Sequence, residues 1–283
     1  MARLLDVKQN FDWAETRGKK LVVFMPNYAH AHLTEFAINQ IRTKVNPKDY
    51  LLVIGNDNVE HNWSHLYDRN VRSFTLLHDH QGPRNGAFIR NYFLKRNESE
   101  ITLQKDGEVI MTGDFIYRAI HCHTPWRAGK IWVVPEHRTK SMLEVTGGVN
   151  WTLERMLITR LVIPMVAENS YHAKEIIETA DGKVNPSTYF HYAYAAPTAV
   201  FQKIGGYDED YEFYGFEDSD MFCRLFHVGV HLMPDAACSA VHPWHPKAKD
   251  CTPENLLKMR QLFVTKSPGD TFRNKTKEWG SGV

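Results

Sequence analysis

The chain has 283 residues, enough for one large domain or two small ones, and its formal net charge of +1 predicts no strong general attraction to nucleic acid. Its four cysteines form no CxxC pair, which argues against a zinc ribbon and against a disulfide framework. The first residues lack the apolar run of a signal peptide, and the most apolar later segment is interrupted by Arg160. We therefore expect a soluble cytoplasmic protein with no membrane segment.

Strands and helices are expected to alternate in the first half of the chain. Short β-branched runs predict strands, helical spacing predicts helices, and residues 100–116 read as a strand, an acidic turn and a second strand. The strands are expected at 19–25, 50–57 and 71–77, and the helices at 33–45 and 84–96. This order predicts an α/β fold with a mostly parallel sheet flanked by helices, in which ligands bind at the carboxyl ends of the strands. Asn27, Asp57 and Asp106 are expected at such ends.

The second half is less regular. Strands are expected at 130–137 and 160–167, a helix at 149–157 and a loop at 179–188. Residues 218–229 read as a helix whose first turn carries acids, where the helix dipole favours negative charge. From residue 250 onward the composition is that of a polar, modestly basic tail.

Three polar clusters carry the candidate chemistry. Asp106-Gly107-Glu108 places two acids on one turn, where their oxygens suit Mg²⁺ or Mn²⁺; a solvated hairpin turn is the alternative. His242-Pro243-Trp244-His245 places two imidazoles three residues apart, which favours Mn²⁺ over Mg²⁺; a pair of surface histidines is the alternative. The acid-rich stretch 205–225 offers a general base at a helix start, or ordinary helix capping by Asp218 or Ser219.

The order of these clusters resembles that of nucleotide-sugar-dependent glycosyltransferases of the GT-A fold, above all family two and the beta-1,4-galactosyltransferase and chondroitin-synthase groups. "LVVFMPNYAHAHLTEFAINQI" and "LLVIGNDN" resemble their first two strands, and "GPRNGAFIRN" resembles the segment that closes over uridine and ribose. "KDGEV" stands at the D-x-D motif, and "VHPWHP" resembles the histidine motif of the metal site. The most specific match is "GGYDEDYEFYGFEDSDMFCRL".

The resemblance covers about residues 19–249 and includes three departures. Glu108 replaces the second Asp of D-x-D, "GNDN" replaces the usual "D-D-G-S", and "YGFED" replaces "WGGED" with the loss of one glycine. The expected organisation is a single GT-A, Rossmann-like catalytic domain over 1–283. Its nucleotide-sugar-binding half spans about 19–125, its acceptor-binding half about 126–249, and its basic tail 250–283.

The resemblance implies an inverting, metal-dependent transferase that moves a sugar from a nucleotide sugar, with a UDP-sugar expected, to a hydroxyl of a glycan acceptor. Asp218 is the expected general base, and Glu217, Tyr214 and Trp244 are expected to contact the acceptor. The expected ligands of Mn²⁺ (or Mg²⁺) are Asp106, Glu108, His242 and His245. The expected nucleotide-sugar contacts are Pro26, Asn27, Asp57, Arg84, Arg90 and Asp106. Asp208 and Glu209 are expected to order the turn after Gly205-Gly206.

Three other readings stay open. The same chemistry can act on a hydroxymethylated base of viral DNA, with Trp126 and Trp244 stacked on a flipped base and basic residues along the phosphates. Those basic residues are Lys247, Lys249, Lys258, Arg260, Lys266, Arg273, Lys275 and Lys277. Alternatively the domain binds a glycan or a nucleotide without catalysis. A hydrolase with paired carboxylates fits the acids but not the order of strands in the first half.

Overall fold

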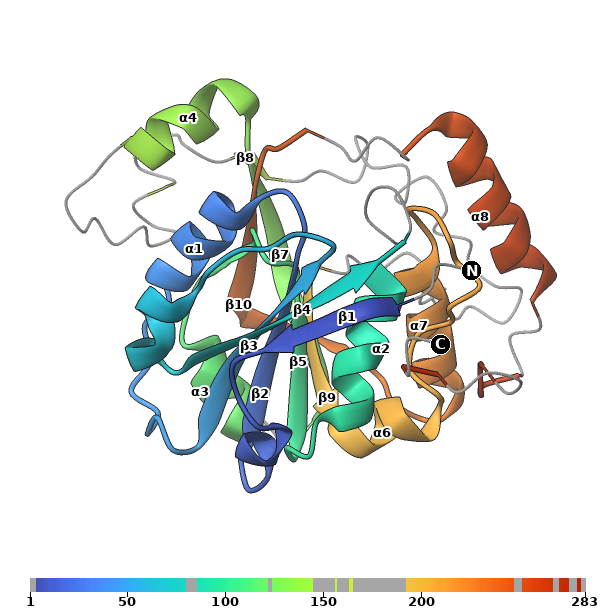
Figure 1. Ribbon diagram of the computed structural model, residues 1–283. Helices are drawn as coiled ribbons and strands as arrows, with labels where there is room; N and C mark the ends of the chain where they lie inside the picture. Colours follow the sequence, from blue (N-terminus) through green and yellow to red (C-terminus); the bar gives the residue numbers. More distant parts are fainter. Residues whose placement is uncertain are drawn as a thin grey trace.

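A single mixed sheet organises the computed structural model, which describes residues 4–79, 86–121, 124–144, 156, 163–164, 192–246, 251–266, 270–274 and 279–280 (Figure 1). Its strand order is β1-β4-β3-β2-β5-β9-β7-β10-β6, with β8 paired to β7. The strands are β1 (Leu4–Gln9), β2 (Leu21–Asn27), β3 (Tyr50–Asp57), β4 (Val71–His78), β5 (Ile101–Lys105), β6 (Ile110–Met111), β7 (Trp126–Val134), β8 (Ile163–Pro164), β9 (Ala193–Pro197) and β10 (Met233–Pro243).

Helices cover both faces of this sheet (Figure 1). They are α1 (Ala31–Asn39), α2 (Gly86–Arg96), α3 (Phe115–His121), α4 (Glu136–Glu144), α6 (Thr198–Lys203), α7 (Glu217–His227) and α8 (Pro253–Thr265), with short 3-10 turns at Trp13–Thr16 and Ser64–Arg69. Within the described ranges, no helix is both long enough and apolar enough to cross a bilayer.

The first half forms the parallel block β4-β3-β2-β5. Alternate residues of β2 enter opposite cores: Leu21 and Val23 pack on the α1 and α3 side, while Val22 and Phe24 pack on the α2 and α7 side. Burial on both faces explains why this strand is apolar at every position rather than at every second one. The predicted α/β class with a parallel first half is confirmed.

The pairing of β6 decides the position of the acidic turn. Strand β6 does not fold back on β5 as a hairpin but pairs antiparallel with β10, matching Ile110 with Val241 and Met111 with Ala240. Strand β10 in turn runs parallel to β7. The turn that precedes β6 therefore lies beside the carboxyl end of β10, at the same edge of the sheet as the ends of β2 and β3. The hairpin alternative is wrong.

Several element boundaries differ from the sequence expectation. Helix α1 ends at Asn39 rather than at 45, and Ile41 and Val45 pack on the core from the loop that leads into β3. The strand expected at 130–137 begins earlier, at Trp126, and ends at Val134, before Pro135 and α4. The elements expected at 149–157 and 179–188, and most of 160–167, lie outside the described residues.

Several elements were not expected, among them β9, β10, α3, α4 and α6, and two more lie near the ends of the described chain. Strand β1 pairs antiparallel with β4 at the sheet edge, in the stretch before residue 19 where no family motif was recognised. Helix α8 occupies part of the supposed basic tail: the Thr252 side chain accepts a hydrogen bond from the Asn255 amide, and Pro253 stands at the first helical position. Both termini therefore contribute regular structure.

Candidate active site

The acidic turn after β5 is held rigidly against the end of β2. A Cβ on Gly107 would lie 2.6 Å from the carbonyl oxygen of Pro26 and from Oγ1 of Thr34, so only glycine permits this approach. Beneath the turn, the buried Lys105 donates from Nζ to the carbonyl oxygens of Asp106 (2.8 Å) and Gly107 (2.9 Å). Burial lowers the pKa of Lys105 to about 8, although the acids beside it oppose the shift.

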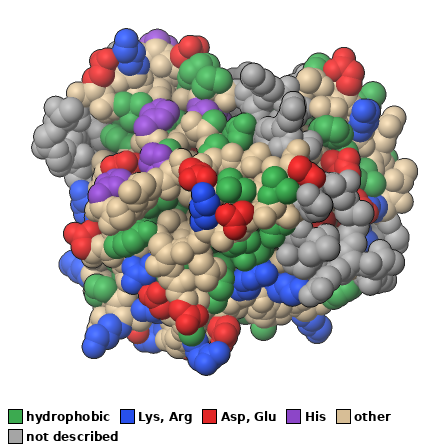
Figure 2. Space-filling model, viewed as in Figure 1, with side chains coloured by type: hydrophobic (Ala, Val, Ile, Leu, Met, Phe, Trp, Pro, Cys, Tyr) green, Lys and Arg blue, Asp and Glu red, His purple; other side chains and the backbone are tan. Residues whose placement is uncertain are grey.

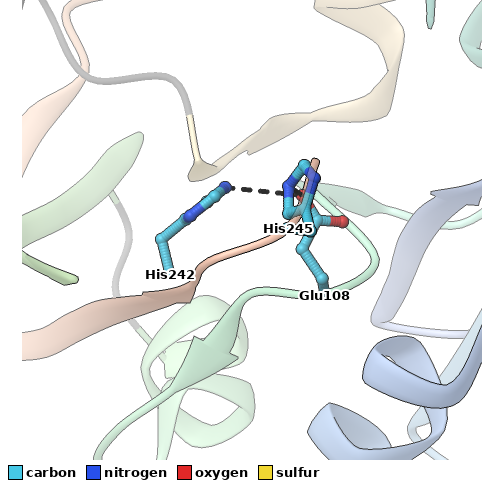
Figure 3. Close-up of side chains that lie close together, drawn as sticks. All are labelled: Glu108, His242 and His245. Carbon is cyan, nitrogen blue, oxygen red and sulfur yellow. Dashed lines mark ion pairs between the residues drawn. The ribbon is translucent and has the colours of Figure 1, made fainter. Parts of the chain in front are cut away.

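Glu108 and two imidazoles meet at this edge (Figure 3). Oε1 of Glu108 lies 3.6 Å from Nε2 of His242 and 3.2 Å from Nε2 of His245, and one ligand atom of each residue lies within 4.8 Å of the others. Burial raises the pKa of Glu108, but the two imidazoles beside it outweigh burial, so the pKa lies well below its usual value. Burial lowers the pKa of His245, but Glu108 outweighs it and the net shift is upward.

The donor set of this cluster fits a divalent cation. Nδ1 of His245 lies 3.0 Å from the carbonyl oxygen of Pro246, which can only accept, so Nδ1 donates and Nε2 is left to face Glu108. One carboxylate and two imidazoles suit Mn²⁺ better than Mg²⁺. The ring centroid of His30, at the start of α1, lies 4.2 Å from that of His245. Sequence reasoning had not included His30.

Asp106 lies beside this cluster and faces an arginine. Nη2 of Arg90, on α2, donates to Oδ1 of Asp106 at 2.6 Å, and the guanidinium lies 5.4 Å from the ring centroid of Tyr207. Burial raises the pKa of Asp106 to about 6 although Arg90 lowers it, and the charge of Asp218 adds to the rise. Asp218, Asp106 and Glu217 all act electrostatically on Arg90. The Arg90 guanidinium therefore links the acidic turn to the acids of α7.

Glu217 and Asp218 open α7 after a backbone turn with two left-handed residues. Gly215 has φ +107° and Phe216 has φ +69°, a conformation that is rare for a bulky side chain and costs on the order of 1–3 kcal/mol. The Gly215 amide donates to Oε2 of Glu217 at 3.0 Å. Burial, reinforced by the charge of Asp218, raises the pKa of Glu217 to about 8, so this carboxyl is mostly protonated at neutral pH. Phe216 occupies the position of the glycine that the family motif has here.

The other residues predicted to contact the nucleotide sugar lie mainly at the ends of β2 and β3. Asn27 is buried at the end of β2, where its Nδ2 donates to Oδ1 of Asn56 at 2.9 Å, and the neighbouring Pro26 is half-buried. Oδ1 of Asp57 lies 2.7 Å from Nε2 of His78, and both side chains are buried. His78 was missed because an imidazole at the end of a different strand carries no local signal. Arg84 lies outside the described residues.

Two aromatic side chains are exposed near the acids. Tyr214 has a relative exposure of 52% and Trp244 of 41%. The Trp244 amide donates to the carbonyl oxygen of Val134 and to Oγ1 of Thr139, which fixes its backbone. Trp126, by contrast, is 2% exposed in β7 and belongs to the core. The interpretation of Trp126 as a stacking platform for a flipped base is wrong.

The acids of 205–225 divide into two groups. Glu217 and Asp218 act electrostatically on Arg90. Asp208 and Asp220, in contrast, are buried and form ion pairs with Arg273; Lys266 also pairs with Asp208 and Arg224 with Asp220. Lys266 and Arg273 had been candidate phosphate contacts, and the structure instead pairs them with carboxylates of the same chain. The structural role expected of Asp208 agrees with these contacts. Oε1 of Glu209 accepts from Asn91 and from the Gly280 amide.

The chain shares its fold with known sugar transferases. Residues 172–239 match the family described as the N-terminal domain of galactosyltransferase, a minor part of the chain. GalNAc-T7, solved with UDP, GalNAc and Mn²⁺, is similar at 12% identity and a TM-score of 0.52, over 89% of this chain and 47% of that one. No curated protein matches the chain at a significant level.

Two further solved structures are similar at lower scores. TarS 1-349 from S. aureus, in complex with UDP-GlcNAc, has 15% identity and a TM-score of 0.49 over 87% of this chain and 66% of that one. The mannosyltransferase PcManGT from Pyrobaculum calidifontis, with GDP-Man and Mn²⁺, has 14% identity and a TM-score of 0.47 over 81% and 58%. The chain spans 39% of the longer TarS structure. The expected GT-A architecture and the resemblance to GT-A glycosyltransferases are confirmed.

Proposed function

We propose that this GT-A protein is a metal-dependent, inverting glycosyltransferase that moves a sugar from a UDP-sugar to a hydroxyl group of a glycan, within a single catalytic domain. One observation carries the proposal: the Arg90–Asp106 ion pair interacts electrostatically with Glu108 and His242 of the cluster and with Asp218 and Glu217 of α7. A cation site and a proton acceptor thus border one polar edge. UDP and Mn²⁺ in GalNAc-T7, which shares the fold, support this choice of donor and metal.

Glu108, His242 and His245 are the residues that would hold Mn²⁺ (or Mg²⁺), with Asp106 adjacent. When bound, such a cation neutralises charge on the donor diphosphate and acts as a Lewis acid on the departing oxygen. Lys105 fixes the backbone of the turn that carries Glu108. Arg90 orients Asp106 by donating a hydrogen bond to its Oδ1.

The donor nucleotide is assigned to the ends of β2 and β3. Asn27 and Asp57 lie at neighbouring strand ends, paired in register so that Asn27 stands beside Asn56. The carboxylate of Asp57 is oriented by His78, which fixes its position for a ribose or uracil contact. Pro26, Arg84 and Arg90 complete the proposed donor contacts.

The two carboxyl groups of α7 are assigned different protonation states. Because the pKa of Glu217 is raised to about 8, it retains its proton at neutral pH and can donate a hydrogen bond that orients the acceptor. Asp218, whose negative charge contributes to that rise, is the proposed base that takes the proton from the acceptor hydroxyl. A base on the face opposite the leaving group gives a single displacement with inversion. The exposed rings of Tyr214 and Trp244 offer apolar faces to sugar rings.

A DNA acceptor is less well supported than a glycan. Trp126 is a core residue, and Lys266 and Arg273 are engaged with Asp208 and Asp220. On the face shown in Figure 2, Lys and Arg are interspersed with Asp and Glu rather than gathered in one basic surface. A continuous basic track is what binding to a phosphate backbone requires.

The decisive experiment screens nucleotide sugars with Mn²⁺ for release of the nucleoside diphosphate, with and without glycan acceptors. We expect one UDP-sugar to be turned over, chelation to stop the reaction, and Mn²⁺ to restore it. His245→Ala should remove the activity, whereas His65→Ala, an exposed histidine near α1, should retain it. The anomeric configuration of the product, read by NMR, tests inversion. A folded protein that turns over no nucleotide sugar, as an inactive binding domain would, or that is fully active in excess chelator, contradicts the proposal.

A further inference from the structure

The turn that presents Glu217 and Asp218 is in a conformation that its own sequence does not favour. Phe216 sits in the left-handed region at φ +69°, directly after Gly215 at φ +107°. A bulky residue stays in this region only where surrounding structure holds it there, and such turns cluster at functional sites. Whatever packs on Gly215 and Phe216 therefore helps to fix the direction of the two carboxyl groups that follow.

Helix α8 packs on this turn. The ring of Phe263 lies 5.6 Å from that of Phe216, centroid to centroid. Leu256, one turn into the helix, lies so close to Gly215 that a Cβ there would be 2.8 Å from its Cδ1. On the same helix, Nζ of Lys258 lies 5.6 Å from the ring centroid of Phe213. The contacts of α8 thus converge on residues 213–216, immediately before α7.

Beyond α8, the chain docks into an acid socket, which we define as the carboxylates of Asp208 and Asp220. Their side chains are 2% and 4% exposed. Arg273 reaches both carboxylates, at 3.3 Å to Asp208 and 3.2 Å to Asp220, and Lys266 pairs with Asp208. Asp220 lies in the first turn of α7, so Arg273 holds the same helix end from a second direction.

Backbone contacts show that the docking is close. Nδ2 of Asn274 donates to the carbonyl oxygens of Gly205 (2.9 Å) and Tyr207 (2.7 Å), and its Oδ1 accepts from the Glu209 amide at 3.1 Å. At Gly205, with φ +75°, a Cβ would lie 2.6 Å from the carbonyl oxygen of Arg273. The glycine turn and the C-terminal residues are therefore shaped to each other.

We propose that α8 together with Lys266, Arg273 and Asn274 is a positioning element for the transfer reaction, which sets the direction of Glu217 and Asp218 through the Gly215–Phe216 turn and the acid socket. Phe263 and Arg273 are its positioning residues. This inference rests on the proposed function. The acid-rich stretch is then partly a socket for the C-terminal segment rather than wholly a surface for the acceptor.

Kinetics of Phe263→Ala and Arg273→Met test the proposal, with the exposed Leu257→Ala on the same helix as the control. Since a displacement of about 1 Å costs up to about 100-fold in rate, we expect kcat to fall about 10- to 100-fold in the first two variants. KM for the nucleotide sugar and the Mn²⁺ affinity should change less than about twofold, because the donor edge is left in place. Arg273→Lys, which keeps the charge but cannot bridge both carboxylates as a fork, should recover part of kcat.

Hydrogen–deuterium exchange gives a readout that does not depend on activity. Amides of residues 213–222 should exchange faster in Phe263→Ala and Arg273→Met than in the parent chain, while amides of residues 105–111 should not. If the parent chain turned over no nucleotide sugar, the proposed function would be contradicted. The exchange result would then be the test of the positioning element. Wild-type exchange at 213–222 in both variants overturns the inference. An active, folded Phe263→Ala or Arg273→Met enzyme with unchanged kcat, whatever its Tm, also overturns it.

Discussion

The turn that carries Asp106 and Glu108 and the acid socket of Asp208 and Asp220 both bring carboxylates together below the surface, but they differ in the cations that face them. Glu108 faces two imidazoles, and its side chain keeps 16% exposure. The socket faces two guanidinium groups and an ammonium group, and its carboxylates are 2% and 4% exposed. Histidine can release its proton near neutral pH and leave a lone pair for a metal, whereas arginine cannot. Of these carboxylates, Glu108 is therefore the one whose partners can change state and share a metal ion with it.

The largest effect is expected from removing the proposed metal ligands. Glu108→Gln combined with His245→Ala removes two of the three clustered ligands. Because even outer residues of metal sites contribute about 10- to 100-fold to affinity, we expect Mn²⁺ binding to weaken by more than about 100-fold and transfer to fall to background. Titration calorimetry with Mn²⁺ measures the first effect. Retained Mn²⁺ affinity in the double variant would place the cation elsewhere.

Next in size is removal of the proposed base. Asp218→Asn should lower kcat by about 10²- to 10⁴-fold, the usual contribution of a general base, while binding of the nucleotide sugar stays nearly intact. Asp210→Asn is the matched control, because this acid of the same stretch is half exposed and faces Lys266 rather than Arg90. Turnover of Asp218→Asn at a tenth of the parent rate would show that another group accepts the proton.

Substitutions in the acid socket are expected to lower the stability of the fold. Arg224 is 1% exposed and bonds Asp220 as well as the carbonyl oxygens of Ile204 and Gly206. Arg224→Met leaves the buried Asp220 with Arg273 as its remaining cationic partner and takes the donor away from two carbonyl oxygens, so it should lower the free energy of unfolding by about 3 kcal/mol. Lys140→Met, which removes an exposed pair on α4, should change it little. Denaturant unfolding measures both, and equal effects would refute the distinction between socket and surface.

The last predicted effect is spread over several pH units and is a pH dependence carried by Glu217. Its pKa is raised from 4.5 to about 8 in the folded chain, so between these values the folded state keeps a proton that the unfolded state has lost. Stability is therefore highest below pH 4.5 as far as this group is concerned, and falls as the pH rises toward 8, in total by on the order of a few kcal/mol. Glu217→Gln should remove that decline when unfolding is measured from pH 5 to 8 without divalent cations. The exposed Glu212→Gln should keep the parent slope.

The parallel half of the fold and the ligand motifs followed from local sequence, whereas the pairing of side chains did not. The apolar runs of β2 and β3 are local patterns, and Glu108 and His245 were found because their motifs are short and ordered. The ion pair between Arg90 and Asp106, by contrast, depends on where α2 packs, and no short motif encodes that packing. The C-terminal residues were read as a polar basic tail with candidate phosphate contacts, because Lys266 and Arg273 pair with acids that are far away in sequence. In the sequence, a basic residue in a polar stretch cannot be distinguished as solvent-exposed or as paired with a buried carboxylate.

The pairing of β6 with β10 has a consequence for the chain as a polymer. Glu108 stands just before β6 and His242 near the end of β10, so a bound cation would tie together two points that are remote in sequence but lie on neighbouring strands of the sheet. Because the ligands come together only in the native state, the cation binds that state alone and stabilises it by mass action. The Tm of the protein should thus rise with the concentration of free Mn²⁺, and thermal unfolding then reports on binding of the ion.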